Sequence, residues 1–313
     1  MRILILILLL FPLLLTANDL SGIDVAYYDF DPRIIAMGGA SVAVQGTSPA
    51  SIIANPAALA GQNEQYLFQV SNSTYLDLIN YNYAGVSWQQ QPGQILSLAM
   101  DFSGDEALSE YEMILSYSRI LSKFNLGLNL KLLGSSYGDN ANGAWYDENG
   151  LNHQVHGSSY GFAIDWGLQY EINAQQRLGI FNRNLVNTIF YDSQNEVGTA
   201  EGKYNESRPV SLVLGYCYQI PKVQFALDYD LSLYGDREDY LRTGLEIALI
   251  NNILKLRTGM ATKLYSLDTQ HYNLGCGIAF KIASKELQLD IAYRIFTQWQ
   301  GYNNLIFGLK ISI

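Results

Sequence analysis

The sequence predicts an all-β protein, a 14-stranded antiparallel transmembrane β-barrel with an N-terminal hatch segment in its lumen. Three observations predict it. Apolar side chains alternate with small or polar ones through most of the chain after residue 64, which is the two-residue period of a strand with unlike faces. The connections between these runs are alternately short and long. Aromatic residues reach 12%, with 23 Tyr, whereas charged residues fall to 15%, a composition that favours strands.

The composition also narrows the choice of partners. Nineteen Lys and Arg against 29 Asp and Glu leave a net charge of −10, which argues against a surface that follows nucleic-acid phosphates. The two cysteines, Cys217 and Cys276, lie too far apart to form a CxxC metal motif, and two cysteines do not make a disulfide framework. We expect no nucleic-acid partner, no metal and no cofactor.

The first element, residues 1–17, has the pattern of a secretory signal peptide. Arg2 precedes an apolar run from Ile3 to Leu15, and small residues follow it, so cleavage is expected after Ala17. The alternative is a membrane anchor, but a run of 13 residues that includes Pro12 falls short of the ~20 that span a bilayer. The chain is therefore expected to be exported through the Sec pathway.

The second element, residues 18–64, does not alternate and is rich in small residues. Gly38 and Gly39 would let this backbone pass close to a neighbouring one. Asn55 followed by Pro56 and Ala57 is a favourable helix start, because Asn caps free N–H groups and Pro has none to lose. A compact segment of this kind is expected to lie inside the barrel as a hatch or plug. The alternative is a flexible periplasmic leader.

The third element, residues 65–313, is predicted to form the barrel. Fourteen alternating runs are its candidate strands, and their even number suits a closed antiparallel barrel with both ends on one side. They cover residues 65–72, 81–90, 94–102, 110–119, 124–133, 159–171, 176–185, 209–220, 223–233, 240–249, 253–263, 271–282, 286–296 and 303–313.

The two faces of each run are expected to meet different surroundings. In residues 271–282, Leu274, Ile278 and Phe280 share the face assigned to lipid, whereas Ala279 lies on the other. Tight joins such as residues 91–93 alternate with long ones such as residues 134–158 and 186–208, as expected of periplasmic turns and outer loops. Aromatic residues near the strand ends would form two interfacial girdles: Trp88, Tyr117, Tyr170 and Tyr216 at one rim, and Tyr111, Tyr160, Tyr234, Tyr240 and Tyr272 at the other.

The face opposite the apolar one is expected to line the lumen. It is rich in Gly, Ala, Ser and Asn, unlike the water-exposed face of a soluble sandwich, which is the alternative all-β fold. Asp228 and Asp230 lie on this face and are expected to pair with Arg242 or with basic residues across the lumen, because unpaired charges there are costly. The full set of expected lumen charges is Asp165, Asp228, Asp230, Arg242, Glu246, Arg257, Lys281, Asp290, Arg294 and Lys310.

The pattern GxSxG occurs at residues 134–138 and 157–161, without the strand-to-helix turn of a nucleophile elbow, and the sequence holds no Walker loop and no helix-opening GxGxxG. His153 and His156 lie in a predicted outer loop beside Asp147 and Glu148, which would allow a surface metal site. Solvated loop residues explain this pattern better, because no further ligand spacing supports a metal. We expect a protein that is not an enzyme.

The stretch Ala-Met-Gly-Gly-Ala at residues 36–40, followed by Asn55, Pro56 and Ala57, resembles the N-terminal signature of the FadL/PorV superfamily of outer-membrane barrels, especially its PorV/PorQ-like branch. The strand count, the hatch and a terminal strand that ends on Ile313 agree with the resemblance. The chain departs from the signature in three places: Thr47 and Ser48 stand where many relatives carry two acidic residues, Ile53 and Ala54 where an aromatic precedes the Asn, and Ala58 where a Gly often follows. The resemblance implies a place in a Gram-negative outer membrane, in contact with its lipid.

The same resemblance implies a non-enzymatic component of type IX protein secretion, which binds or presents secreted cargo at the cell surface. Its partners would be cargo proteins or other secretion components. The alternative is a FadL-like passive transporter of hydrophobic compounds, and a third function is a plugged barrel that mainly presents its loops. Polar loops at residues 138–143 and 201–205 favour the secretion hypothesis over lipid capture.

Overall fold

The computed structural model describes residues 30–75, 79–105, 107–138, 146–195, 197–198, 202–234, 239–264, 270–282, 285–296 and 303–313. The expected signal peptide, residues 1–17, and the first part of the expected hatch, residues 18–29, lie outside these ranges. Both remain predictions.

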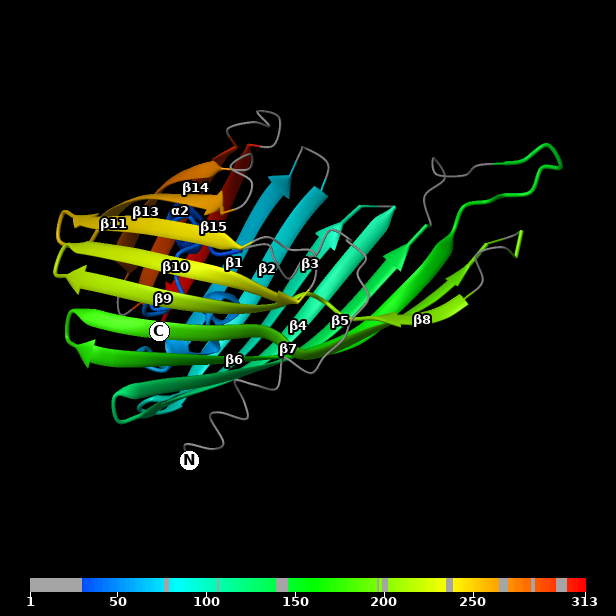
Figure 1. Ribbon diagram of the computed structural model, residues 1–313. Helices are drawn as coiled ribbons and strands as arrows, with labels where there is room; N and C mark the ends of the chain where they lie inside the picture. Colours follow the sequence, from blue (N-terminus) through cyan, green and yellow to red (C-terminus); the bar gives the residue numbers. More distant parts are fainter. Residues whose placement is uncertain are drawn as a thin grey trace.

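Strands make up most of the described chain, and 14 of them form one closed antiparallel ring (Figure 1). Each strand of the ring pairs with its neighbours along the chain, and β1 pairs with β15. The predicted 14-stranded antiparallel barrel is therefore confirmed. The ring consists of β1 (Tyr66–Tyr75), β2 (Ile79–Gln91), β3 (Gln94–Gly104), β4 (Leu108–Leu121), β5 (Phe124–Tyr137), β6 (His156–Asn173), β7 (Gln176–Gln194), β9 (Val210–Ile220), β10 (Val223–Tyr234), β11 (Tyr240–Leu249), β12 (Leu254–Lys263), β13 (His271–Ile282), β14 (Lys285–Phe296) and β15 (Asn304–Ser312).

The seam between the first and last strands closes the ring. Leu67 lies opposite Ser312, and the ladder runs from there to Thr74 and Leu305. The amide of Tyr66 donates to the carbonyl of Ile313, and the amide of Ile313 donates back, both at 3.0 Å. Neither edge strand is left with a row of unpaired N–H and C=O groups, so the wall satisfies its own backbone within the membrane.

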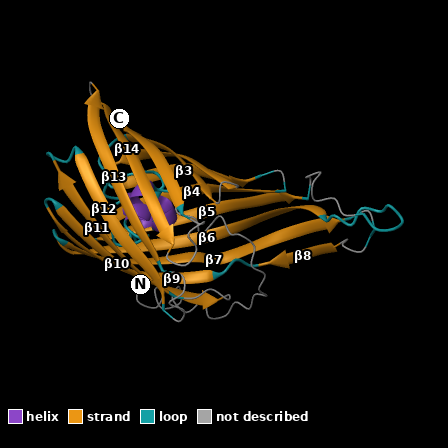
Figure 2. Ribbon diagram, turned by 90° about the horizontal axis from the view of Figure 1, so that it is seen from above, coloured by secondary structure: helices purple, strands orange, loops and turns teal. Residues whose placement is uncertain are grey.

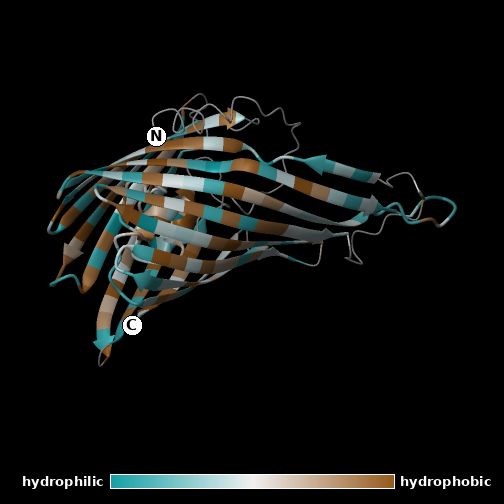
Figure 3. Cartoon of the chain, turned by 90° about the horizontal axis from the view of Figure 1, so that it is seen from below, coloured by the Kyte–Doolittle hydropathy of each residue, from teal (hydrophilic) through white to brown (hydrophobic). Residues whose placement is uncertain are grey.

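Hydrophobic and hydrophilic residues alternate along the strands as predicted (Figure 3). Leu274 and Ile278 of β13 are 53% and 46% exposed on the outer face, where lipid replaces water. On β10, by contrast, Ala226, Asp228 and Asp230 point inward and are fully buried. Large apolar residues on the outer face and small or polar residues inside are the reverse of a water-soluble barrel.

The two rims of the barrel differ. Five of the predicted tight joins lie at one rim, which we call the tight-turn rim: the turns at residues 92–93, 122–123, 174–175, 221–222 and 250–253. Gly93, Ser122 and Asn251 have positive φ in these turns, as short hairpins require. The sixth predicted tight join includes residues 283–284, which lie outside the described ranges. The opposite end is the long-loop rim, which in outer-membrane barrels faces outward.

One predicted loop is wrong. Residues 186–208 were expected to be irregular, but β7 continues to Gln194 and pairs with an extra strand, β8 (Gly202–Glu206), past the long-loop rim (Figure 1). The rings of Tyr191 and Tyr204 stack across this hairpin with centroids 4.9 Å apart. A strand outside the membrane has no lipid face, so it carries polar residues on both sides and loses the alternation that marks the other strands.

The described part of the hatch segment, residues 30–64, lies inside the ring of strands (Figure 2). It contains α2 (Pro32–Ala36), α3 (Ser51–Ala54) and η3 (Pro56–Leu59), all buried. Segment α2 packs against β12–β15, and η3 packs against β4–β6 on the other side of the ring. The predicted hatch in the lumen is confirmed. None of the helices in the described ranges is long and apolar enough to cross a bilayer.

Candidate functional site

The candidate site is the lumen, where the hatch segment meets the wall. Gly38 and Gly39 both have positive φ, +68° and +81°. A Cβ atom on Gly38 would lie 2.6 Å from the backbone nitrogen of Met260 and 2.7 Å from the carbonyl oxygen of Thr243. Both the conformation and the close approach of hatch and wall backbones thus require glycine at position 38.

Asn55 sits at the centre of the hatch and is fully buried. Its side-chain oxygen accepts from the amide of Ala57 at 2.9 Å, and its amide group donates to the carbonyl of Val42 at 2.7 Å. Pro56 follows it as the first residue of η3, so the predicted helix start is present, although the helix is a single 3₁₀ turn. On the wall, Gly127 leaves room for Pro56, because a Cβ there would collide with the hatch backbone.

Asp228 anchors the hatch, a role that differs from the one expected. The sequence predicted that Asp228 and Asp230 pair with Arg242 or with other basic residues. Asp230 does pair with Arg242 at 2.8 Å. The second carboxylate oxygen of Asp228 instead accepts from the backbone amides of Ser41 and Val42, at 2.6 and 2.9 Å. Two free N–H groups of a tight turn thus take the place of a cation.

A first charge network ties the hatch to the wall near the tight-turn rim. Arg33 of α2 donates to Glu246 at 2.9 Å and to the side-chain carbonyl of Gln224 at 2.9 Å. Glu246 also accepts from Arg257 at 2.6 Å, and Arg257 binds Asp290 at 2.5 Å. Two arginines and two carboxylates therefore neutralise one another in a buried position, as charges removed from water must.

A second charge network crosses the lumen nearer the long-loop rim. Arg208, which follows β8, donates to Glu112 at 2.7 Å, and Lys131 lies 3.5 Å from Glu112 and 2.8 Å from Asp165. Asp165 also accepts from the amide of Asn184, whose positive φ marks a bulge in β7. Only Asp165 of this network was among the predicted lumen charges. Glu112 and Lys131 occupy inward positions of alternating runs, so the same pattern could have found them.

The other predicted lumen charges lie in different surroundings. Lys310 is buried on β15, and Arg294 is half-buried with its guanidinium 3.2 Å from the side-chain oxygen of Asn273. Lys281 is exposed at the tight-turn rim and lines a cavity there. Arg33 and Asp31 of the hatch were not predicted. Burial raises the pKa of Asp31, whose carboxylate accepts from the Arg33 amide at 2.8 Å.

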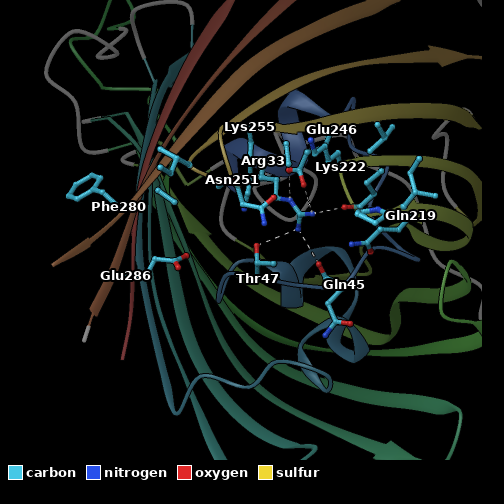
Figure 4. Close-up of a pocket in the computed structure, with 18 of the residues that line it drawn as sticks. Arg33, Gln45, Thr47, Gln219, Lys222, Glu246, Asn251, Lys255, Phe280 and Glu286 are labelled. Atoms are coloured by element: carbon cyan, nitrogen blue, oxygen red, sulfur yellow. Dashed lines mark hydrogen bonds and ion pairs between the residues drawn. The ribbon is translucent and has the colours of Figure 1, made fainter. Parts of the chain in front are cut away.

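A polar cavity of about 890 Å³, which we call the vestibule, opens between the hatch and the tight-turn rim (Figure 4). Arg33 and Thr47 of the hatch form part of it, and the wall contributes Lys222, Glu246 and Lys255. The hatch therefore separates this vestibule from the rest of the lumen.

An apolar cluster fills the lumen on the side of β1–β4. Phe30, Ile52 and Leu59 of the hatch are buried there against wall residues that include Tyr81 and Ile114. The ring of Phe30 stacks on Tyr83 with centroids 5.9 Å apart. One side of the plug is thus held by charges and hydrogen bonds and the other by burial of apolar surface, and the chain continues from the plug into β1 at Tyr66.

The histidine pair does not form a metal site in the described part of the chain, where no group of three or more His, Cys, Asp or Glu side chains converges. The ring of His153 lies 3.2 Å from Asp147. Backbone N–H donation, led by Leu151, lowers the pKa of that carboxylate. Asp147 therefore organises its own loop.

No family model matches the sequence, and no curated protein matches it. Solved structures do resemble the fold. The CymD monoaromatic hydrocarbon channel matches with a TM-score of 0.63 at 13% identity, over 90% of this chain and 96% of that one. The Pseudomonas putida toluene transporter TodX matches with a TM-score of 0.59 at 14% identity, over 95% and 99%. A Pseudomonas aeruginosa FadL homologue matches with a TM-score of 0.57 at 11% identity, over 90% and 97%. The fold is that of FadL-type outer-membrane channels.

Proposed function

We propose that this chain is a passive channel that carries hydrophobic small molecules across a Gram-negative outer membrane, which is the alternative function of the sequence analysis. The observation that carries the proposal is a closed barrel whose lumen holds a hatch positioned by hydrogen bonds, ion pairs and apolar contacts with the wall. Structures similar to it over most of both chains include a monoaromatic hydrocarbon channel and a toluene transporter. They are channels and not enzymes.

Part of the lumen is suited to apolar solutes. The hatch lies across the lumen, and both charge networks are paired internally. The apolar cluster of Phe30, Ile52 and the neighbouring wall residues offers a hydrocarbon a surface where the hatch meets β1–β4. There, a solute would replace apolar contacts between hatch and wall with apolar contacts of its own.

The secretion hypothesis gains no support from the similar structures. CymD is a monoaromatic hydrocarbon channel and TodX is a toluene transporter, and neither is described as a carrier of protein cargo. A PorV/PorQ-like role therefore remains only a prediction from the resemblance of the N-terminal signature.

The test measures the uptake of radiolabelled toluene by cells that carry the chain in an outer membrane with an intact lipopolysaccharide leaflet. We expect faster uptake than in cells without it, and no change in the uptake of a sugar of similar size. Cys217 of the wall and Ala43 of the hatch belong to one buried cluster, so Ala43→Cys under a mild oxidant tests whether a disulfide between them locks the hatch. The locked barrel should lose toluene uptake, and a reductant should restore it.

The matched control is Ala43→Cys with Cys217→Ser, which cannot form this disulfide and should be insensitive to oxidant. Toluene uptake no faster than in cells that lack the chain would contradict the channel proposal. Full uptake through the locked barrel would show that toluene passes without movement of the hatch.

A further inference from the structure

The vestibule at the tight-turn rim carries an excess of positive charge. Four cationic residues line it, Arg33, Lys222, Lys255 and Lys281, against two carboxylates, Glu246 and Glu286. The chain as a whole has a net charge of −10. A local excess of two positive charges in such a chain marks this cavity as a place that attracts anions.

The carboxylates do not neutralise the lysines. Glu246 is held by the guanidinium groups of Arg33 and Arg257 at 2.9 and 2.6 Å. Glu286 lies opposite Lys281 in the β13–β14 ladder, but their charged atoms are not within the 4.0 Å of an ion pair. Across the ranges that the structure describes, no carboxylate lies within that distance of the ammonium groups of Lys222, Lys255 or Lys281.

The lysines also surround one space. Lys255 and Arg33 lie close together in the vestibule, and Lys222 projects from the β9–β10 turn at its edge (Figure 4). Asn251 and Asn252, in the β11–β12 turn, add side-chain amides to the lining. Ammonium, guanidinium and amide groups around a cavity of about 890 Å³ provide charge-assisted donors for a ligand with several oxygen atoms.

We propose that the vestibule binds a small organic dianion, of the dicarboxylate or phosphate monoester class. Two negative charges match the excess of two positive charges in the lining. The charged groups of the lining favour an anion over a hydrocarbon, and the anion site does not depend on the proposed channel. Because Arg33 belongs to the hatch and Lys255 to the wall, the bound dianion links the two and stabilises the plugged state.

Calorimetric titration of the full chain in a non-ionic detergent tests the proposal. Succinate represents the dicarboxylates, glycerol 3-phosphate the phosphate esters, and 1,4-butanediol is the uncharged control. We expect at least one dianion to bind with one site per chain, more weakly as salt is added, and no binding of butanediol. The relative affinities of the two dianions identify the chemical class.

Three substitutions locate the site. Lys255→Met should lower the affinity for the dianion by about tenfold, which corresponds to the loss of one charge-assisted hydrogen bond. Lys255→Arg should retain most of the affinity. Lys222→Met, in an exposed turn that tolerates substitution, should weaken binding in the same direction. The matched control is Lys123→Met, in the exposed β4–β5 turn outside the vestibule, which should bind as the wild type does.

Binding of butanediol as tight as that of the dianions, or no binding of either dianion, would overturn the proposal. Equal affinity in the wild type, Lys255→Met and Lys222→Met would also overturn it. None of these outcomes bears on toluene uptake, so failure of the anion site and failure of the channel can be told apart.

Discussion

Ile278 and Ala279 are neighbours in β13 with opposite surroundings. Ile278 is 46% exposed on the outer face, and Ala279 lines the vestibule. Ile278→Arg would place a cation among lipid chains and should lower the free energy of unfolding by about 2 to 4 kcal/mol. Ala279→Arg, whose side chain reaches water, should cost less. Urea unfolding in lipid vesicles measures both, and the opposite order would reverse the assignment of faces.

Asp31 gives the hatch a dependence on pH. Burial raises its pKa above the ordinary value of 3.8, so the folded chain holds this proton to higher pH than the unfolded chain does. The contribution of Asp31 to the free energy of unfolding is therefore fully present below pH 3.8, and it is lost as the pH rises through the raised pKa. We expect the hatch to resist protease better at acidic than at neutral pH.

Asp31→Asn is the matched control, because it keeps an oxygen that accepts from the Arg33 amide and removes the titration. Its protease resistance should vary less with pH than that of the wild type. An identical pH profile in the two proteins would assign the dependence to other carboxylates of the lumen.

Sequence reasoning at the level of single residues succeeded where alternation fixes the direction of a side chain. Asp165, Asp228 and Glu246 all point inward, as their positions in alternating runs predict. It failed for Arg33, which lies in the hatch, where no period applies. The partners of Asp228 could not be predicted either, because they are backbone amides, which every residue except proline carries.

The hatch acts as one element, and its fit depends on a few backbone approaches. Asn55→Ala removes a helix cap worth about 1 kcal/mol and a donor to the Val42 carbonyl. Gly38→Val adds a side chain where φ is +68° and the wall backbone is 2.6 Å from the Cβ position. The double variant should loosen the plug, while the strand ladders, which do not involve it, keep the barrel closed.

Planar-bilayer recording measures this change. The wild type should be nearly closed to ions, and the double variant should conduct. Gly150→Val is the matched control, because Gly150 also has positive φ but lies in an outer loop with open space around it. Equally large conductance in the wild type and the double variant would show that the segment does not block the pore.

Strands were easier to predict than the short helices. Each of the 14 barrel strands separates lipid from lumen and so carries a two-residue period. The start of η3 was also predicted, from Asn55 and Pro56. Asp31 and Pro32 form the same capping signal at the start of α2, where Asp31 accepts from the Arg33 amide, so this segment could have been recognised as well. The cap of α3 has no side-chain hydrogen bond and gave no such signal.

The closed ring makes a prediction for the whole molecule. Because every barrel strand is paired on both sides, the detergent-extracted protein should resist unfolding by dodecyl sulfate until heated, and should migrate faster on a gel when unheated. Circular dichroism should show mainly β-structure. A water-soluble monomer with a helical spectrum would contradict the fold.

The fold of the whole molecule was predictable, but the balance between functions was not. Polar outer loops favoured secretion over hydrocarbon transport in the sequence, whereas solved structures that share the fold include a hydrocarbon channel and a toluene transporter. Loops outside the membrane carry no constraint from the wall, so their polarity can change while the barrel stays the same. The alternating pattern of the strands therefore predicts a membrane barrel but does not predict which solute the barrel carries.

The seam between β1 and β15 also sets an order of assembly. The hatch precedes every strand in the sequence, yet α2 rests against β12–β15, the last strands of the chain. Until residue 304 has been exported, β1 and β14 are both open edges, and α2 lacks only its contact with β15. Contacts between residues so distant along the chain form slowly. A chain that stops before its final strand can therefore hold most of the contacts of its hatch and still leave two unpaired edges in the membrane.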